Sequence, residues 1–226
     1  TLDPIQKADL SKVNEYYRNK LKSDKDYNGM IQATSVTSNG NLILLYQTKA
    51  GILTGYNVPY TSLGDVGISL VSPEGKAVSG VAINYSIKRT GTTENSFHYD
   101  ATRKGRKIPF SYQDPSLGKS WYLNMDLVAT DKANYLFCNN TKENFDKPET
   151  EKASLVVDIP TTNAVQYTFT NTGFDKKYLF GEPAGKKDGK FCNFTASSYD
   201  QSTKTYCTIM LDAKEKKSKV AWLKLD

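Results

Sequence analysis

Histidine and cysteine, two residue types that often carry catalysis, are scarce in this chain of 226 residues, which has one histidine and three cysteines. The only histidine is His98, in the sequence NSFHYD, so a Ser-His-Asp mechanism would depend on it. No Gly-x-Ser-x-Gly turn surrounds a serine. Residues 116–119 match Ser-x-x-Lys only as text, because they follow Asp-Pro and contain glycine. The sequence therefore predicts a non-enzymatic protein. A hydrolase acting on glycan or peptide, through His98 or paired carboxylates, is the alternative.

Metal and cofactor sites are not expected either. The three cysteines and His98 could in principle bind zinc, but no Cys-x-x-Cys or His-x-x-x-His pair exists. Residues 181–186 resemble a phosphate loop but are one residue short, and no Ser or Thr follows the lysine. There is no calcium-binding loop and no dinucleotide fingerprint. We therefore expect no metal and no cofactor.

Basic residues beside aromatic ones form the candidate binding patch. The chain has a formal net charge of +6, and one short basic cluster precedes two aromatic side chains. The candidate binding residues are Arg103, Lys104, Arg106, Lys107, Phe110 and Tyr112. The cluster is either a solvated loop or a contact with an acidic surface such as glycan, membrane or nucleic acid. Phe110 could stack on a base or sugar, or belong to the core. A second basic cluster, at 214–219, is interrupted by Glu215 and allows the same two interpretations. Nucleic acid is an unlikely partner, because the lysines are otherwise scattered and no known nucleic-acid signature is present.

Two cysteines bracket a polar turn in FCNFTASSYDQSTKTYCTIML, residues 191–211. A four-residue turn at 198–201 would place Cys192 opposite Cys207, with both on the apolar face of an antiparallel hairpin. Directly opposed residues lie within disulfide reach. We therefore predict a Cys192–Cys207 disulfide, although a slip of one residue in register would separate the two. Cys138 remains as a buried thiol, an intermolecular bridge or a shared ligand.

The elements that would position these residues are one helix and many strands. Leu10, Val13, Tyr17 and Leu21 recur at helical spacing after Asp3-Pro4, which predicts an amphipathic helix over residues 4–21. A single apolar stripe indicates that the helix lies on a sheet. Beyond residue 30 the period becomes that of strands. The predicted fold is mainly β (α+β), with antiparallel sheets and this N-terminal helix packed on them.

Turn signals divide the β region into strands. Asn39-Gly40 separates strands at 30–37 and 41–48, and residues 73–75 separate strands at 67–72 and 77–89. Further strands are predicted at 107–112, 120–128, 153–159, 164–170 and 176–180. The charged segment 139–152 is either a surface loop or a linker. The predicted organisation is 1–138 as helix plus β-meander, 139–152 as loop or linker, and 153–226 as a C-terminal β region.

A helix near the N-terminus, a meander beyond it and the late Cys192…Cys207 pair resemble the layout of type IV pilin and pseudopilin ectodomains. The resemblance implies a subunit of a surface appendage that self-assembles. In that family an apolar N-terminal half-helix builds the filament and is usually removed to make soluble protein. A chain that begins at Thr1 fits such a truncation.

The predicted function is therefore that of a non-enzymatic extracytoplasmic binding or structural protein, such as a minor pilin-like subunit or an adhesin. Its partner would be a protein or glycan on a surface. Tyrosine is frequent, at 15 residues, and gives contact area at low entropic cost. The sequence contains no run of about 18 apolar residues, the length that a membrane-spanning helix needs. A secreted effector that binds a host protein is a further alternative.

Overall fold

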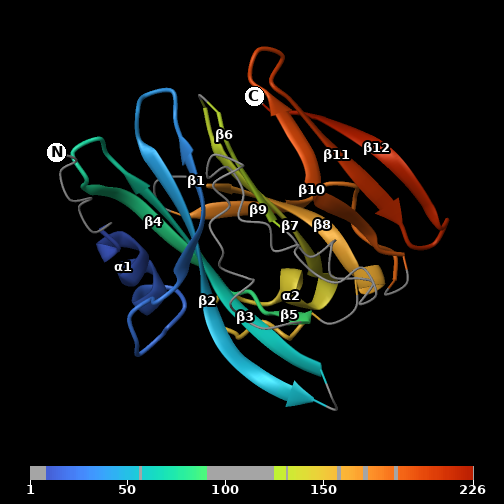
Figure 1. Ribbon diagram of the computed structural model, residues 1–226, viewed down its shortest axis with the longest axis horizontal. Helices are drawn as coiled ribbons and strands as arrows, with labels where there is room; N and C mark the ends of the chain where they lie inside the picture. The colour runs from blue at the N-terminus through green and yellow to red at the C-terminus, as the bar shows by residue number, and fades with distance from the viewer. Residues whose placement is uncertain are drawn as a thin grey trace.

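The computed structural model shows a mainly β protein with a short N-terminal helix, which confirms the predicted fold class (Figure 1). It describes residues 9–55, 58–90, 125–130, 132–156, 159–169, 173–185 and 188–225. Their strands form three antiparallel sheets. In two of them the strands follow one another in chain order, and in the five-stranded sheet the last strand pairs with the third strand and not with the fourth.

Sheet A has five strands: β1 (Met30–Val36), β2 (Leu42–Gly55), β3 (Val58–Val71), β4 (Ala77–Ile83) and β5 (Ile87–Thr90). Sheet B has four: β6 (Met125–Ala129), β7 (Asn134–Thr141), β8 (Thr162–Phe169) and β9 (Phe174–Tyr178). Sheet C has three: β10 (Lys190–Asp200), β11 (Thr205–Asp212) and β12 (Lys217–Lys224). The helices are α1 (Ser11–Asn19), α2 (Lys142–Asp146) and the 3₁₀ turn η5 (Ile159–Thr161).

The two strongest turn predictions are confirmed. Gly40, between β1 and β2, has a φ of +82°, and Gly75, between β3 and β4, has a φ of +81°. Glycine adopts this left-handed conformation without the steric penalty that a Cβ brings. Both turns therefore join consecutive strands of sheet A as the sequence predicted.

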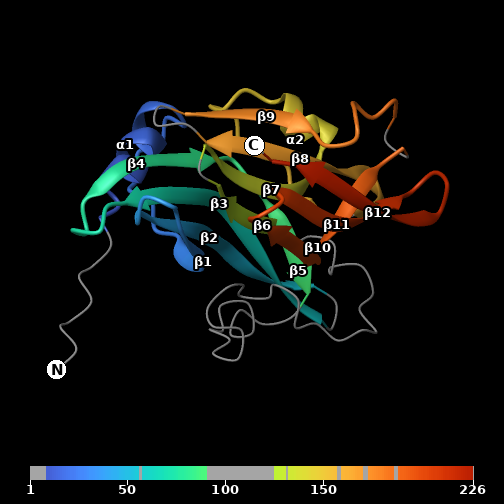
Figure 2. The ribbon, with the colours of Figure 1, turned by 90° about the horizontal axis from the view of Figure 1, so that it is seen from above.

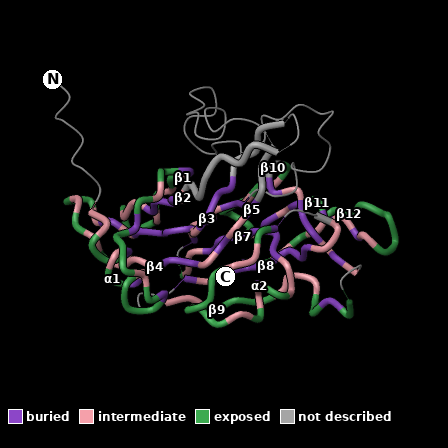
Figure 3. Tube along the Cα trace, turned by 90° about the horizontal axis from the view of Figure 1, so that it is seen from below, coloured by how far each residue is buried: buried purple, intermediate pink, exposed green. Residues whose placement is uncertain are grey.

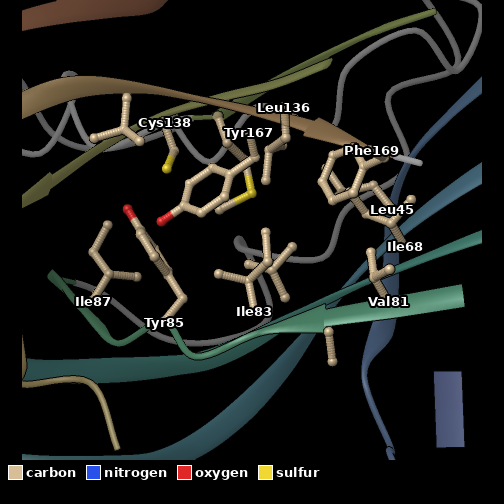
Figure 4. Close-up of a cluster of buried hydrophobic side chains, with 14 of the residues drawn as sticks. Leu45, Ile68, Val81, Ile83, Tyr85, Ile87, Leu136, Cys138, Tyr167 and Phe169 are labelled. Carbon is tan, nitrogen blue, oxygen red and sulfur yellow. The ribbon is translucent and has the colours of Figure 1, made fainter. Parts of the chain in front are cut away.

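Sheet B lies between sheets A and C, so both of its faces are covered. Leu136 and Cys138 on β7 pack in the hydrophobic cluster shared with sheet A (Figure 4). Their neighbours Tyr135 and Phe137 point the other way, into the cluster shared with sheet C. Successive side chains of a strand alternate between faces. This explains why the middle six residues of β7 are all buried.

Helix α1 covers the opposite face of sheet A. Val13 of the helix packs with Tyr27, Leu44 and Tyr46, whereas Ile43 and Leu45 of the same strand face sheet B. The approach is close, because a Cβ added at Gly80 of β4 would lie 2.4 Å from the backbone nitrogen of Val13. The layers are therefore α1, sheet A, sheet B and sheet C (Figure 2).

The described part of the predicted helix is shorter than expected. It begins at Ser11, whose backbone N–H donates to Asp9 Oδ1 at 2.9 Å, and it ends at Asn19. Asp3 and Pro4, predicted to start the helix, lie outside the described residues. Of the predicted apolar stripe, Val13 and Leu21 are buried and Tyr17 is only partly so.

The segment 139–159 differs from the prediction. Residues 139–141 belong to β7, and Thr141 then caps α2 by accepting a hydrogen bond from the N–H of Asn144 at 3.3 Å. The strand predicted at 153–159 is wrong for its described residues. It forms a single bridge between Val156 and Ile87, because the backbone of Ser154 is bound by the side chain of Asn144 instead of by a strand.

Candidate functional site

The predicted binding patch cannot be placed. Arg103, Lys104, Arg106, Lys107, Phe110 and Tyr112 all lie outside the described residues, as does His98. The predicted strand at 107–112 lies outside them as well. The patch therefore stays a prediction.

The predicted Cys192–Cys207 disulfide is wrong in this structure, because all three cysteines are free thiols. Cys192 pairs with Met210, and Cys207 pairs with Ser198. The two cysteines lie on opposite faces of sheet C: Cys192 is in the core shared with sheet B, and Cys207 is partly exposed. The side chain of Cys138 packs in the other core cluster, between sheets A and B.

Two features of the hairpin explain this correction. Its turn lies at residues 201–204, three positions later than predicted, since Asp200 pairs with Thr205. The strand β10 also carries a bulge between Asn193 and Ser198, where the partner strand advances only from Ile209 to Cys207. A bulge changes which residues face each other beyond it. No feature of the sequence predicts this bulge, because residues 195–198 (TASS) are an ordinary run of small, mostly polar residues.

A groove of about 410 Å³ lies where edge strands of the three sheets meet. Strand β1 supplies Thr34, Ser35 and Val36, strand β6 supplies residues 126–129, and strand β10 supplies residues 197–199. In Figure 1 the turn after β1 and the turn after β10 lie at the same end of the molecule, with β6 between them. Turns that gather at one end of stacked sheets are a common place for binding sites.

The bulge in β10 helps to build this groove. It turns Ser197 toward β6, where its hydroxyl donates to Asp126 Oδ2. Tyr206 of β11 donates to the same oxygen at 3.0 Å. Burial, followed by the negative charge of Asp126, raises the pKa of Tyr206 well above its usual value, so the phenol stays a donor at neutral pH. Asp126 is thus a buried acceptor that ties sheet B to sheet C at the groove.

The rest of the lining is rich in hydroxyl groups. The described residues that line the groove include seven with a hydroxyl: Thr34, Ser35, Ser38, Thr130, Ser197, Ser198 and Tyr199. They also include Gln201, and Asp126 is the one carboxylate among them. No lysine, arginine or cysteine is among these lining residues. Hydroxyls both donate and accept hydrogen bonds, so this lining suits an uncharged polar ligand.

Two kinds of chemistry have no support in the described part of the chain. It holds no group of three or more His, Cys, Asp or Glu side chains arranged to bind a metal ion. Glycoside hydrolysis by a pair of carboxylates needs a second carboxyl group about 5 to 10 Å from the first. The described lining of the groove offers only Asp126.

No described helix has the length and apolar character needed to cross a bilayer.

Comparison with known proteins gives no relative. No family model matches the chain, and neither the curated proteins nor the solved structures include a match. The resemblance to pilin ectodomains is therefore left as an expectation about layout.

Sequence reasoning missed the groove because its three walls are far apart in the chain. Residues 34–38, 126–130 and 197–201 meet only after the sheets stack. A signal was present at each wall, since every one of these segments ends a strand and contains Ser or Thr. Many other strand ends in this sequence share that feature, so it could not select these three.

Proposed function

We propose that this protein is a non-enzymatic binding protein that holds an uncharged, polyhydroxylated ligand, such as a neutral oligosaccharide, in the groove between β1, β6 and β10. The observation that carries the proposal is the lining: seven hydroxyl-bearing side chains, one amide and one buried carboxylate already held by two hydroxyls. Such groups recognise sugar hydroxyls by exchanging hydrogen bonds.

A location at the cell surface agrees with this proposal, but one of the sequence arguments for that location, the predicted disulfide, no longer holds. The expected disulfide would have indicated an oxidising compartment, and the three thiols are free. Extracytoplasmic location, membership of an appendage and a role as an adhesin are proposals that rest on composition and on the order of elements. A protein that presents a sugar-binding groove at one end would suit any of these roles.

The test is a screen of neutral oligosaccharides by ligand-observed NMR, with a variant that fills the groove. Ser35 lines the groove and pairs with Ile43, whose side chain faces sheet B, so Ser35→Trp should fill the groove and abolish binding. Asn28→Trp places the same side chain at an exposed position before β1 and should bind as the unmodified protein does. Equal binding by both variants would contradict the groove. Cleavage of an oligosaccharide during the screen would support a hydrolase instead.

A further inference from the structure

Three asparagines of the chain stand in the acceptor sequence for N-linked glycans, Asn-x-Ser/Thr. They are Asn84 (in NYS), Asn139 (in NNT) and Asn193 (in NFT). Such a sequence receives a glycan only in a compartment that holds the transferase, and an occupied site lies on the surface, because a glycan is bulky and polar. The positions of these asparagines in the fold therefore bear on where the protein can fold.

Asn139 lies in the middle sheet and is fully buried. Strand β7, which carries it, is buried along most of its length (Figure 3). The side-chain nitrogen Nδ2 donates to the carbonyl oxygen of Cys192 at 2.7 Å, and Oδ1 accepts from the N–H of Cys192 at 2.8 Å. Cys192 is buried, and so is Ala164, the β8 residue opposite Asn139. A sugar attached to Nδ2 would therefore have to lie between sheets B and C.

The amide of Asn84 also holds another part of the chain in place. Its Nδ2 donates to the carbonyl oxygens of Glu149 and Glu151, the second at 2.9 Å. These two bonds use both hydrogens of the nitrogen. N-glycosylation replaces one hydrogen with a sugar, so one bond would be lost. Asn84 is partly exposed, so a glycan there would disturb the loop at 149–151 but not the core between sheets B and C.

Asn193 is placed where a glycan would do no harm. It follows Cys192 on β10, and its partner on β11 is Ile209, which is 36% exposed. Opposed residues share one face of a sheet, so Asn193 lies on the outer face of sheet C, where it is partly exposed. A glycan on Asn193 would project away from sheet B. This site therefore offers an internal control for the other two.

The fold cannot shield Asn139 from the transferase. In the reaction, C1 of the sugar forms a bond with Nδ2, the bond from C1 to the diphosphate of a lipid carrier breaks, and one proton leaves the amide. The enzyme acts on the extended chain, before the fold has formed. Cys192, which buries the amide, lies 53 residues further along the chain. A glycan already fixed on Asn139 would keep β10 from packing on β7, because its hydroxyl groups would lose their hydration there.

We propose that N-glycosylation at Asn139 and this fold exclude each other, and that the protein therefore folds in a compartment without the transferase, such as the cytosol or a bacterial cell envelope. The cysteines agree with this proposal. Cys138 packs between sheets A and B, Cys192 packs between sheets B and C, Cys207 lies on the outer face of sheet C, and all three are free thiols. A fold with cysteines so placed gains no disulfide from the oxidising lumen in which N-glycosylation takes place.

The test compares two substitutions at position 141. Thr141→Ser keeps the acceptor sequence of Asn139, and Thr141→Asn removes it. Thr141 caps α2 by accepting from the N–H of Asn144 at 3.3 Å, and Ser and Asn are equally good caps. The parent chain and both variants carry Ser86→Ala, which removes the acceptor sequence of Asn84 and leaves that asparagine in place. Made in the bacterial cytosol, all three should fold and should be equally stable in urea.

The same three chains are then made in insect cells behind a cleavable signal peptide. The parent and Thr141→Ser should carry a glycan on Asn139 and stay inside the cell. Thr141→Asn should reach the medium as protease-resistant protein, in an amount several-fold greater. Peptide mapping measures the glycans, and a glycan on Asn193 of the secreted chain shows that the transferase met it.

Three results would overturn the proposal. The first is secretion of folded protein with a glycan on Asn139. The second is secretion of the folded parent chain with Asn139 unmodified, and the third is equal retention of Thr141→Ser and Thr141→Asn. None of these results bears on the groove, because sugar binding is measured on protein made in bacteria.

Discussion

Strands β7 and β12 are each eight residues long, but they are buried in opposite ways. In β7 the middle six residues are buried, including Asn139 and Asn140. In β12 six residues are exposed, including Val220 and Trp222. The position of a strand among the sheets, rather than the hydropathy of each residue, decides this difference. β7 lies in the middle sheet, whereas β12 is at the edge of an outer sheet.

The two buried asparagines of β7, Asn139 and Asn140, both have hydrogen-bond partners. Asn139 donates to the carbonyl oxygen of Cys192 at 2.7 Å and accepts from its N–H at 2.8 Å. Its side chain thus links β7 of sheet B to β10 of sheet C, two strands that do not pair with each other in a sheet. Asn140 accepts from the backbone N–H of Thr141 at 2.9 Å. Hydrogen bonding removes the penalty that burial of an amide would otherwise bring.

The largest expected difference between β7 and the outer face of sheet C is in the reactivity of their thiols. Cys138 on β7 is fully buried, and burial raises the pKa of its thiol, while Cys207 is partly exposed and lies opposite Trp222 on the outer face of sheet C. The thiolate is the reactive form. We expect alkylation of Cys207 in the native protein to be faster by a factor on the order of a thousand or more, because Cys138 reacts only after unfolding. Peptide mapping after timed alkylation measures the two rates.

The same experiment tests the corrected pairing of the cysteines. Denaturation without reductant, followed by alkylation and an intact mass, should show three modified thiols. A single modified thiol would mean that a disulfide exists and that the register of β10 with β11 is not the one described here.

A truncation at the centre of β7 should cause the largest loss of stability. Phe137 is fully buried and stacks on Tyr206 with ring centroids 4.4 Å apart. Phe137→Ala should lower the free energy of unfolding by about 3 to 5 kcal/mol, through lost burial and the cavity left behind. Urea denaturation measures the loss. A change below about 1 kcal/mol would contradict the buried position of this strand between two sheets.

Removal of the Asn139 side-chain amide, which joins sheets B and C, should lower the free energy of unfolding somewhat less than Phe137→Ala does. Asn139→Ala leaves the N–H and the carbonyl of Cys192 without this partner, and a buried group left unpaired costs about 1 to 3 kcal/mol. We expect a loss of about 2 to 4 kcal/mol in urea denaturation. Asn19→Ala, at the exposed end of α1, is the control and should change stability little.

The smallest effect is expected at the edge of sheet C. Trp222→Ala should change the free energy of unfolding by no more than about 0.5 kcal/mol, since the side chain is mostly exposed. Thermal denaturation of the variant beside Phe137→Ala measures the contrast directly. A loss comparable to that of Phe137→Ala would show that Trp222 packs against the protein and is not exposed.

Local signals in the sequence were sufficient for the fold class but not for the arrangement of the sheets. The strand that begins at residue 77 and the glycines at 40 and 75 depend on backbone geometry within a few residues, so they were predictable. The single strand predicted at 77–89 is wrong in its second half, because the chain leaves the strand at residues 84–86 and returns as β5, which pairs with β3. Strand β7 was missed because burial on both faces removes alternation. Strand β12 was missed because its lysines looked like those of a solvated loop. The groove was not predictable, since it depends on how three sheets stack and on a bulge in β10.

Each sheet is built from one continuous stretch of the chain, and this has a consequence for synthesis of the protein. Sheet A is built from residues 30–90, sheet B from 125–178 and sheet C from 190–224, so every ladder closes before the next sheet begins. Pairing between strands near in sequence forms faster than pairing between distant ones. As the chain emerges from the ribosome, sheet A can form first and offer its inner face to sheet B. The buried amide of Asn139 is then already in place when Cys192, 53 residues later, arrives to bind it.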